Sequence, residues 1–182
     1  MQKKVLSEID IYTGSVDCPK NFEIDRKTIK NSILQSYATD RRSSNNSRDY
    51  YLDYFVPHSQ PLGWLQDYIR DHFKCDYDKS LIRKAQWGNI YKHNQQSFLR
   101  TTVEPLDLRN SPDYTFVYAV DIGQDSCDII IEYNDNRRAD RTWHVSMKNN
   151  HFIMFPSTQK YFITPNQSKQ LNIFLTISYE FI

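Results

Sequence analysis

The chain has 182 residues, of which 39% are hydrophobic and 25% charged, a composition typical of one soluble globular domain spanning residues 1–182. Its 23 basic and 22 acidic side chains leave a net charge of +1, which argues against binding to nucleic acid or to a membrane surface. The three cysteines are widely separated and odd in number, and no segment has the pattern of a signal peptide or a membrane span. We therefore expect a protein that is made in the cytoplasm.

The first part of the chain, residues 1–80, is predicted to be helical and irregular. Asp25 is a suitable N-cap for a helix over 26–37, because apolar side chains follow it at helical spacing, namely Ile29, Ile33, Leu34 and Tyr37. The polar run 39–48 predicts a loop, and the aromatic run 50–56 predicts a strand. A second helix is predicted over 62–73, with Pro61 suited to its first turn and a buried stripe of Leu62, Leu65, Ile69 and Phe73.

Residues 81–182 have the period-two hydrophobic pattern of strands. The predicted strands cover 114–121, 127–133, 142–148, 151–155, 161–164 and 171–181. Trp87 and Trp143 lie in predicted strands and are expected in the core. Short strands at close spacing favour a sandwich or barrel, and two helices can pack on its outside. The segments 9–13 and 171–182 are predicted edge strands that could pair with another subunit.

Three sequence motifs in the second half of the chain resemble one known family. They are the run W-G-N-I-Y at 87–91, the hairpin-like run 118–130, and the segment 151–177 with F-P-S, T-P-N and then alternating Leu and Ile. In order and spacing they are similar to a 2-oxoglutarate/iron(II) oxygenase family that is common in the genomes of tailed phages. The resemblance implies a mainly β fold, a jelly roll or double-stranded β-helix, with two flanking N-terminal helices.

The resemblance also implies where an iron site would lie. The family holds iron(II) with two histidines and a carboxylate, and these ligand positions fall at Arg100, Thr102 and Tyr161 in this chain. The anchor for the cosubstrate carboxylate, normally an arginine, falls at Lys169 and Gln170. Because all these positions depart from the family pattern, we expect the iron ligands to be lost. The chain is then predicted to bind no metal or cofactor and to have no catalytic residues, with Tyr161 filling the former metal pocket.

Other candidate sites are weaker. His144 and His151 lie on adjacent predicted strands with Asp121 or Glu132 nearby, but no pair has ligand spacing, so ordinary surface or packing histidines are favoured. No G-x-S-x-G nucleophile motif is present. Tyr161 together with Lys169 could polarise a bound carbonyl group.

Taken together, these features predict a non-catalytic structural or interaction protein. The setting of the family suggests a tailed-phage virion component at the neck, tail or head surface, made in the host cytoplasm and bound to other protein subunits, with no nucleic-acid or membrane partner. One alternative is an active iron(II)/2-oxoglutarate-dependent hydroxylase with displaced ligands, which needs His144 or His151 as a ligand. Another is a cupin-like protein that binds a small molecule in a polar barrel cavity.

Overall fold

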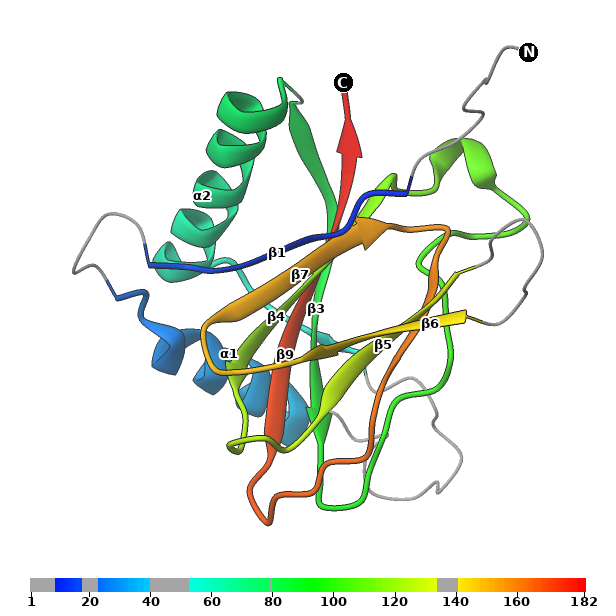
Figure 1. Ribbon diagram of the computed structural model, residues 1–182. Coiled ribbons are helices and arrows are strands. Elements are labelled where there is room, and N and C mark those ends of the chain that lie inside the picture. The colour runs from blue at the N-terminus through cyan, green and yellow to red at the C-terminus, as the bar shows by residue number, and fades with distance from the viewer. Residues whose placement is uncertain (1–8, 18–22, 40–52, 79, 134–140) are drawn as a thin grey trace.

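A computed structural model describes residues 9–17, 23–39, 53–78, 80–133 and 141–182 (Figure 1). The predicted loop at 39–48 and the beginning of the predicted strand at 50–56 lie almost entirely outside these residues. No described helix is both long enough and apolar enough to span a membrane.

Two antiparallel sheets form the body of the molecule. The larger has the strand order β1-β7-β4-β9-β3-β2, with bounds Tyr12–Ser15, His151–Pro156, Tyr114–Asp121, Asn172–Phe181, Leu81–Tyr91 and Tyr54–Phe55. The smaller has the order β6-β5-β8, with bounds Arg141–Ser146, Asp128–Tyr133 and Lys160–Ile163. A single bridge between Arg100 and Tyr161 extends the smaller sheet beyond β8. From β3 onward the chain passes back and forth between the sheets, which is the jelly-roll path predicted from the sequence.

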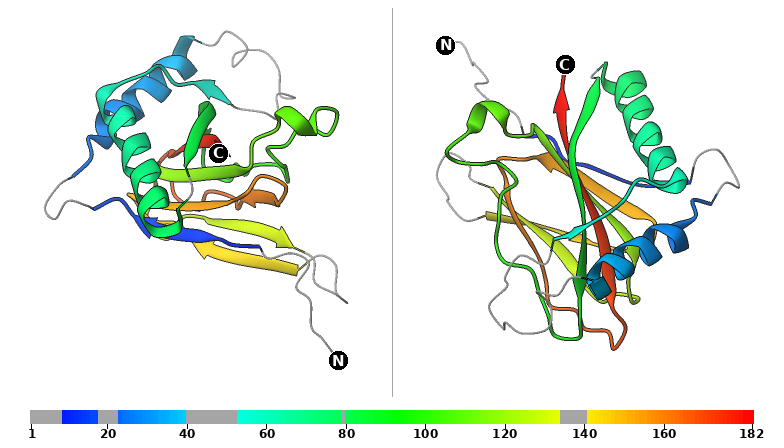
Figure 2. Two further views of the ribbon diagram at one scale, coloured as in Figure 1. Left: turned by 90° about the horizontal axis from the view of Figure 1, so that it is seen from above. Right: turned by 180° about the vertical axis from the view of Figure 1, so that it is seen from behind.

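Both helices lie on the outer face of the larger sheet (Figure 2). α1 spans Arg26–Thr39, and Asp25 caps it as predicted, because its Oδ1 accepts a hydrogen bond from the backbone N–H of Thr28 at 3.1 Å. α2 spans Gln60–Tyr77 and has its proline in the first turn, also as predicted. α1 packs closely on β3 because position 88 is a glycine, where a Cβ would lie only 2.6 Å from the Ile33 side chain.

The larger sheet is buried on both faces, so the molecule has two hydrophobic clusters. The alternation along β4 shows the division. Phe116 and Tyr118 face the cluster beneath the helices, whereas Val117 and Ala119 face the cluster between the two sheets. The sequence of β4 is apolar at nearly every position, which is typical of a strand that is buried on both faces.

Three expectations need correction or refinement. The C-terminal strand β9 is not an edge strand, because it pairs with β3 on one side and β4 on the other. Trp143 is not in the core, since 55% of it is exposed on β6, the end strand of the smaller sheet. The N-terminal part also supplies two strands of the larger sheet, β1 and β2, and β1 is at the edge as expected.

Candidate functional site

The interior between the two sheets is polar at one end. Along the inner face of β9 the side chains change from Phe174 to Thr176, and along β4 they change from Val117 to Thr115. We call this region the polar end and define it by the described residues Asn89, Arg100, Thr102, Thr115, Ser157, Tyr161 and Thr176. Buried polar groups are costly unless they are paired, so such a concentration marks the region as a candidate site.

Arg100 is at the centre of the polar end. Its backbone N–H and C=O pair with those of Tyr161 at 3.0 and 2.9 Å, which holds the two side chains next to each other. The Arg100 Nε donates a hydrogen bond to the Tyr161 hydroxyl at 3.1 Å, and Nη1 donates to both carboxylate oxygens of Asp53 at 2.9 and 3.1 Å. The Nη2 donates to the Asn89 Oδ1 at 3.4 Å. The guanidinium group also lies 5.8 Å from the Trp87 ring and 5.5 Å from the Tyr161 ring.

The protonation states of Arg100 and Tyr161 depend on burial and on these contacts. Burial alone would lower the pKa of Arg100, but the oxygens of Tyr161, Asp53 and Tyr91 outweigh it, and the pKa lies above its ordinary value. Burial raises the pKa of Tyr161, although Arg100 opposes part of this effect. The site therefore contains a permanent cation next to a neutral phenol.

A group of hydroxyls lies beside this pair. The Thr115 hydroxyl donates a hydrogen bond to the Thr102 hydroxyl at 2.7 Å and lies 2.9 Å from that of Ser157. The Thr102 backbone N–H donates to the Ser157 carbonyl at 3.3 Å. All three residues at which the resemblance places iron ligands thus lie at the polar end, with Arg100 and Tyr161 in direct contact.

The predicted anchor residues lie elsewhere. Lys169 and Gln170 are exposed in the turn before β9, where the Gln170 carbonyl accepts a hydrogen bond from Asn166 at 2.7 Å. Neither belongs to the polar end, so the structure does not place Lys169 next to Tyr161.

The side chains at the polar end do not fit an iron(II) centre of the expected kind. Such a centre needs two imidazoles and a carboxylate, whereas the positions of Arg100 and Tyr161 hold a guanidinium group and a neutral phenol. The nearby carboxylate, that of Asp53, is bound to the guanidinium group. Among the described residues, no group of three or more His, Cys, Asp or Glu side chains could hold a metal ion. This includes His144 on β6 and His151 at the start of β7.

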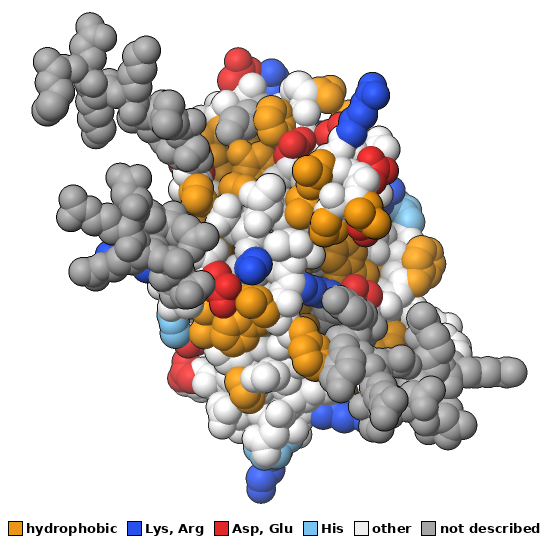
Figure 3. Space-filling model, turned by 90° about the vertical axis from the view of Figure 1, so that its right-hand side faces the viewer, with side chains coloured by type: hydrophobic (Ala, Val, Ile, Leu, Met, Phe, Trp, Pro, Cys, Tyr) orange, Lys and Arg blue, Asp and Glu red, His pale blue; other side chains and the backbone are white. Residues whose placement is uncertain are grey.

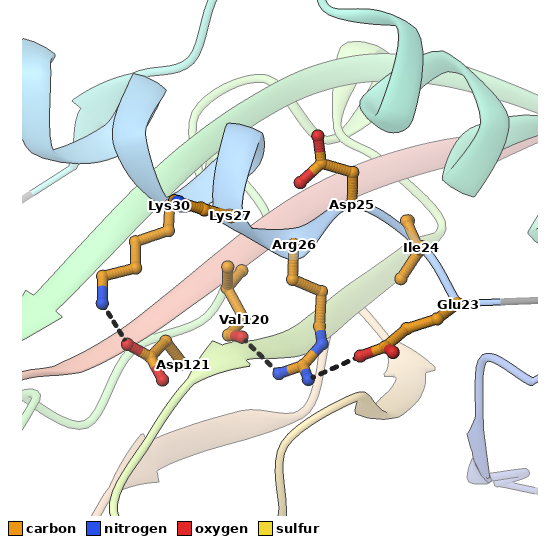
Figure 4. Close-up of a pocket in the computed structure, with 8 residues that line it drawn as sticks. All are labelled: Glu23, Ile24, Asp25, Arg26, Lys27, Lys30, Val120 and Asp121. Carbon is orange, nitrogen blue, oxygen red and sulfur yellow. Dashed lines mark hydrogen bonds and ion pairs between the residues drawn. The ribbon is translucent and has the colours of Figure 1, made fainter.

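A second candidate is a pocket of about 520 Å³ between the N-terminus of α1 and the end of β4 (Figure 4). Its lining carries three basic and three acidic side chains. Figure 4 shows Lys30 paired with Asp121, and Arg26 bound to Glu23 and to the Val120 carbonyl. Because the lining has equal numbers of basic and acidic side chains, and two of each form ion pairs, the pocket has no excess charge for a ligand, and the polar end is the better candidate.

The surface along the connection between β3 and β4, which contains Arg100, is partly apolar. Figure 3 shows this side of the molecule, where hydrophobic side chains lie in separate patches. The exposed large hydrophobic residues of the connection are Phe98, Leu99, Leu106 and Leu108. These side chains share the connection with Arg100, so the same segment presents apolar groups to solvent and supplies the buried cation.

Sequence reasoning did not identify the other members of the polar end, Asn89, Thr115, Ser157 and Thr176, or the neighbouring Asp53. Asp53 lies 47 residues before Arg100, and no local pattern links them. Asn89 is part of the W-G-N-I-Y motif, but the motif alone does not show that its side chain bonds to the guanidinium group.

Comparisons with known proteins support the fold. No protein-family model matches the chain, and no curated protein matches its sequence. A prolyl hydroxylase from Trichoplax adhaerens, solved with a peptide of hypoxia inducible factor, superposes with a TM-score of 0.64 at 10% identity, covering 93% of this chain and 83% of that one. The viral collagen prolyl hydroxylase of Paramecium Bursaria Chlorella virus-1, solved with 2-oxoglutarate, gives 0.63 at 10% identity, covering 93% and 94%. The α-ketoglutarate-dependent carbocyclase SnoK of nogalamycin biosynthesis gives 0.65 at 9% identity, covering 93% and 78%.

These likenesses show that the chain has the double-stranded β-helix fold of the 2-oxoglutarate/iron(II) oxygenases, as the sequence motifs imply. They also correct the expectation that the chain is not an enzyme, because all three of these solved structures are enzymes. That expectation was based on the departures at Arg100, Thr102 and Tyr161, and altered iron ligands do not exclude a different use of the same barrel.

Proposed function

We propose that this chain is an enzyme built on the oxygenase fold, and that its substrate binds at the polar end of the barrel. The observation that carries the proposal is the position of Arg100, whose side chain is only 11% exposed. A buried cation costs free energy, and it persists in a protein when paired or when it serves a site. Enzymes with the same fold support catalysis as the general role of such a barrel.

The residues of the polar end suit the binding of negative charge. Arg100 offers a planar fork of N–H donors that remains charged at any physiological pH. Tyr161 keeps its proton because burial raises its pKa, so its hydroxyl can also donate. Donors fixed in a buried site stabilise a carboxylate or a developing oxyanion more strongly than donors in water.

A second candidate function is an iron(II)/2-oxoglutarate-dependent hydroxylase. The fold shared with an enzyme solved with 2-oxoglutarate favours it. This candidate needs iron ligands that the described residues do not supply. Calorimetry on anaerobic protein, with iron(II) and 2-oxoglutarate added singly and together, separates the two candidates. Iron-dependent binding with release of succinate would establish the hydroxylase, and binding that does not depend on iron would support a site based on Arg100.

The test of the main proposal is a conversion assay. The protein is incubated with a library of small metabolites, and products are detected by mass spectrometry. We expect a compound that the native protein and an Arg109→Met control convert, but that Arg100→Lys does not, since lysine keeps the charge and loses the fork. Arg109 is an exposed residue of the short helix Leu108–Asn110. If no compound is converted in an Arg100-dependent way, the proposal is wrong.

Assembly with other protein subunits in a virion remains a prediction from the family resemblance. Its first requirement is a stable association between chains. Light scattering on the purified protein, alone and mixed with candidate subunits, measures that association directly.

A further inference from the structure

We infer that the ligand of the polar end carries a carboxylate, and that Asp53 occupies the place of this carboxylate in the structure. The inference rests on the proposed function and names the chemical class of its substrate. It also gives Asp53 the role of an internal competitor for the site.

The geometry around Asp53 is that of a carboxylate-binding site. Arg100 Nη1 donates to both of its oxygens, at 2.9 and 3.1 Å, and Asn89 Nδ2 donates to its Oδ1 at 2.6 Å. Charge-assisted hydrogen bonds of this kind are how proteins usually recognise carboxylates. A ligand carboxylate in the same position would receive the same bonds.

The donors are fixed by the barrel and do not depend on Asp53. Asn89 is only 2% exposed, and its Oδ1 accepts hydrogen bonds from the Thr176 hydroxyl at 3.1 Å and from Arg100 Nη2 at 3.4 Å. These two bonds orient the amide so that its N–H₂ group faces outward to the carboxylate. Tyr161 holds the guanidinium group from the other side through Nε. The site is therefore preorganised, which reduces the free-energy cost of binding a ligand.

Asp53, in contrast, belongs to the periphery. It directly precedes β2, a strand of two residues at the end of the larger sheet that pairs with β3 alone. Its side chain is 35% exposed, compared with 11% for that of Arg100. A rotation of the Asp53 side chain into solvent would free the donors without moving the core. Exchange of one carboxylate for another leaves the charge of the site unchanged, so the buried guanidinium group never lacks a partner.

A further donor lies within reach of a ligand that is larger than a carboxylate. The Nε1 of Trp87 is buried and has no hydrogen-bond partner among the described residues, and the Trp87 ring lies 5.8 Å from the Arg100 guanidinium group. An unpaired buried N–H costs free energy, which a hydrogen bond from Trp87 to an oxygen of the ligand would recover. The second polar group of an oxo acid or a dicarboxylic acid suits this role.

The test compares carboxylate binding by variants of Asp53 and Arg100. Calorimetry measures the binding of 2-oxoglutarate and succinate without metal, with succinamide as an uncharged analogue. If Asp53 occupies the site in about nine of ten molecules, Asp53→Asn tightens carboxylate binding about tenfold. Arg100→Lys abolishes the binding, and succinamide does not bind to any variant. The matched control is Asp78→Asn, which removes an exposed aspartate paired with Lys74 and leaves binding unchanged.

The outcomes separate this inference from the proposed function. Equal carboxylate binding by the native protein and by Asp53→Asn would overturn the competitor role of Asp53. If neither protein binds a carboxylate while the conversion assay finds an uncharged substrate that depends on Arg100, the carboxylate class is wrong and the proposed function stands. If the conversion assay also finds no substrate, the proposed function itself fails.

Discussion

Replacing Arg100 by methionine tests how strongly the polar end depends on its cation. The substitution keeps much of the aliphatic stem and removes the guanidinium group. It leaves Asp53 without its ion-pair partner and removes the Nε donor from Tyr161. Both effects destabilise the folded state.

The expected loss in the free energy of unfolding depends on how exposed each contact of Arg100 is. The Asp53 carboxylate is 35% exposed, so its pair with Arg100 contributes no more than about 1 kcal/mol, as for surface pairs. The hydrogen bond from the charged Nε to the buried Tyr161 hydroxyl contributes about 1.5 kcal/mol. The contacts with the Trp87 and Tyr161 rings add about 0.5 kcal/mol or more. We expect Arg100→Met to lower the free energy of unfolding by about 3 kcal/mol.

Urea unfolding followed by circular dichroism measures this loss, and thermal unfolding should show a fall in Tm of about 6–12 °C for a chain of this size. The exposed Arg109→Met is the control and should change the free energy by less than about 0.5 kcal/mol. Combining Arg100→Met with Asp53→Asn should recover part of the loss, because no unpaired carboxylate remains. A loss below about 1 kcal/mol for Arg100→Met alone would refute the view that the cation is integral to the barrel.

Three further predictions concern other parts of the fold. Gly88→Ala should destabilise the protein by about 2 kcal/mol in urea unfolding, since the new Cβ would lie 2.6 Å from the buried Ile33 of α1. The control is Gly63→Ala in α2, where the new Cβ would meet only the exposed His58 at 3.1 Å, so this variant should be as stable as the native protein or more stable. Burial raises the pKa of Cys127 to about 11, so about one thiol in a thousand is ionised at pH 8. Peptide mass spectrometry after iodoacetamide treatment should therefore find the exposed Cys75 alkylated and Cys127 unmodified until the protein unfolds. Alkylation of Cys127 in the folded protein would contradict its burial. Asn172→Leu should lower the free energy of unfolding by about 2 kcal/mol, because the Asn172 Oδ1 accepts hydrogen bonds from the buried Gly123 N–H and the buried Ser126 hydroxyl. Thermal unfolding measures the loss, and an unchanged Tm would show that these two groups find other partners.

Local patterns in the sequence predict the elements well. The cap at Asp25, the stripe on α2 and the apolar run of β4 each depend on neighbours within a few residues, and the structure has all three. The position of a strand within its sheet depends on the whole fold. This explains why β9 was expected at an edge and Trp143 in the core, since both sequences have strand periodicity wherever they lie.

The candidate site could be predicted only in part. The resemblance to the oxygenases leads to Arg100 and Tyr161, because family motifs carry information about contacts across the barrel. Asp53 precedes the motifs, and its contact with Arg100 arises from the pairing of β2 with β3, which no local pattern encodes. The departures at the ligand positions lead only to the expectation that the iron ligands are lost, whereas the hydrogen bonds of Arg100 show which contacts this part of the barrel makes.

Because both faces of β4 are covered, a truncated fragment of this chain must keep the elements on both sides of the larger sheet. The Phe116 and Tyr118 side chains of β4 are covered by the helices, while its Val117 and Ala119 side chains are covered by the smaller sheet. A fragment that begins at β3 would present two large aromatic rings of its central sheet to water, and such a surface aggregates. The helices are therefore as necessary to a soluble barrel as the second sheet is, and expression trials should retain α1 and α2 even when only the polar end is under study.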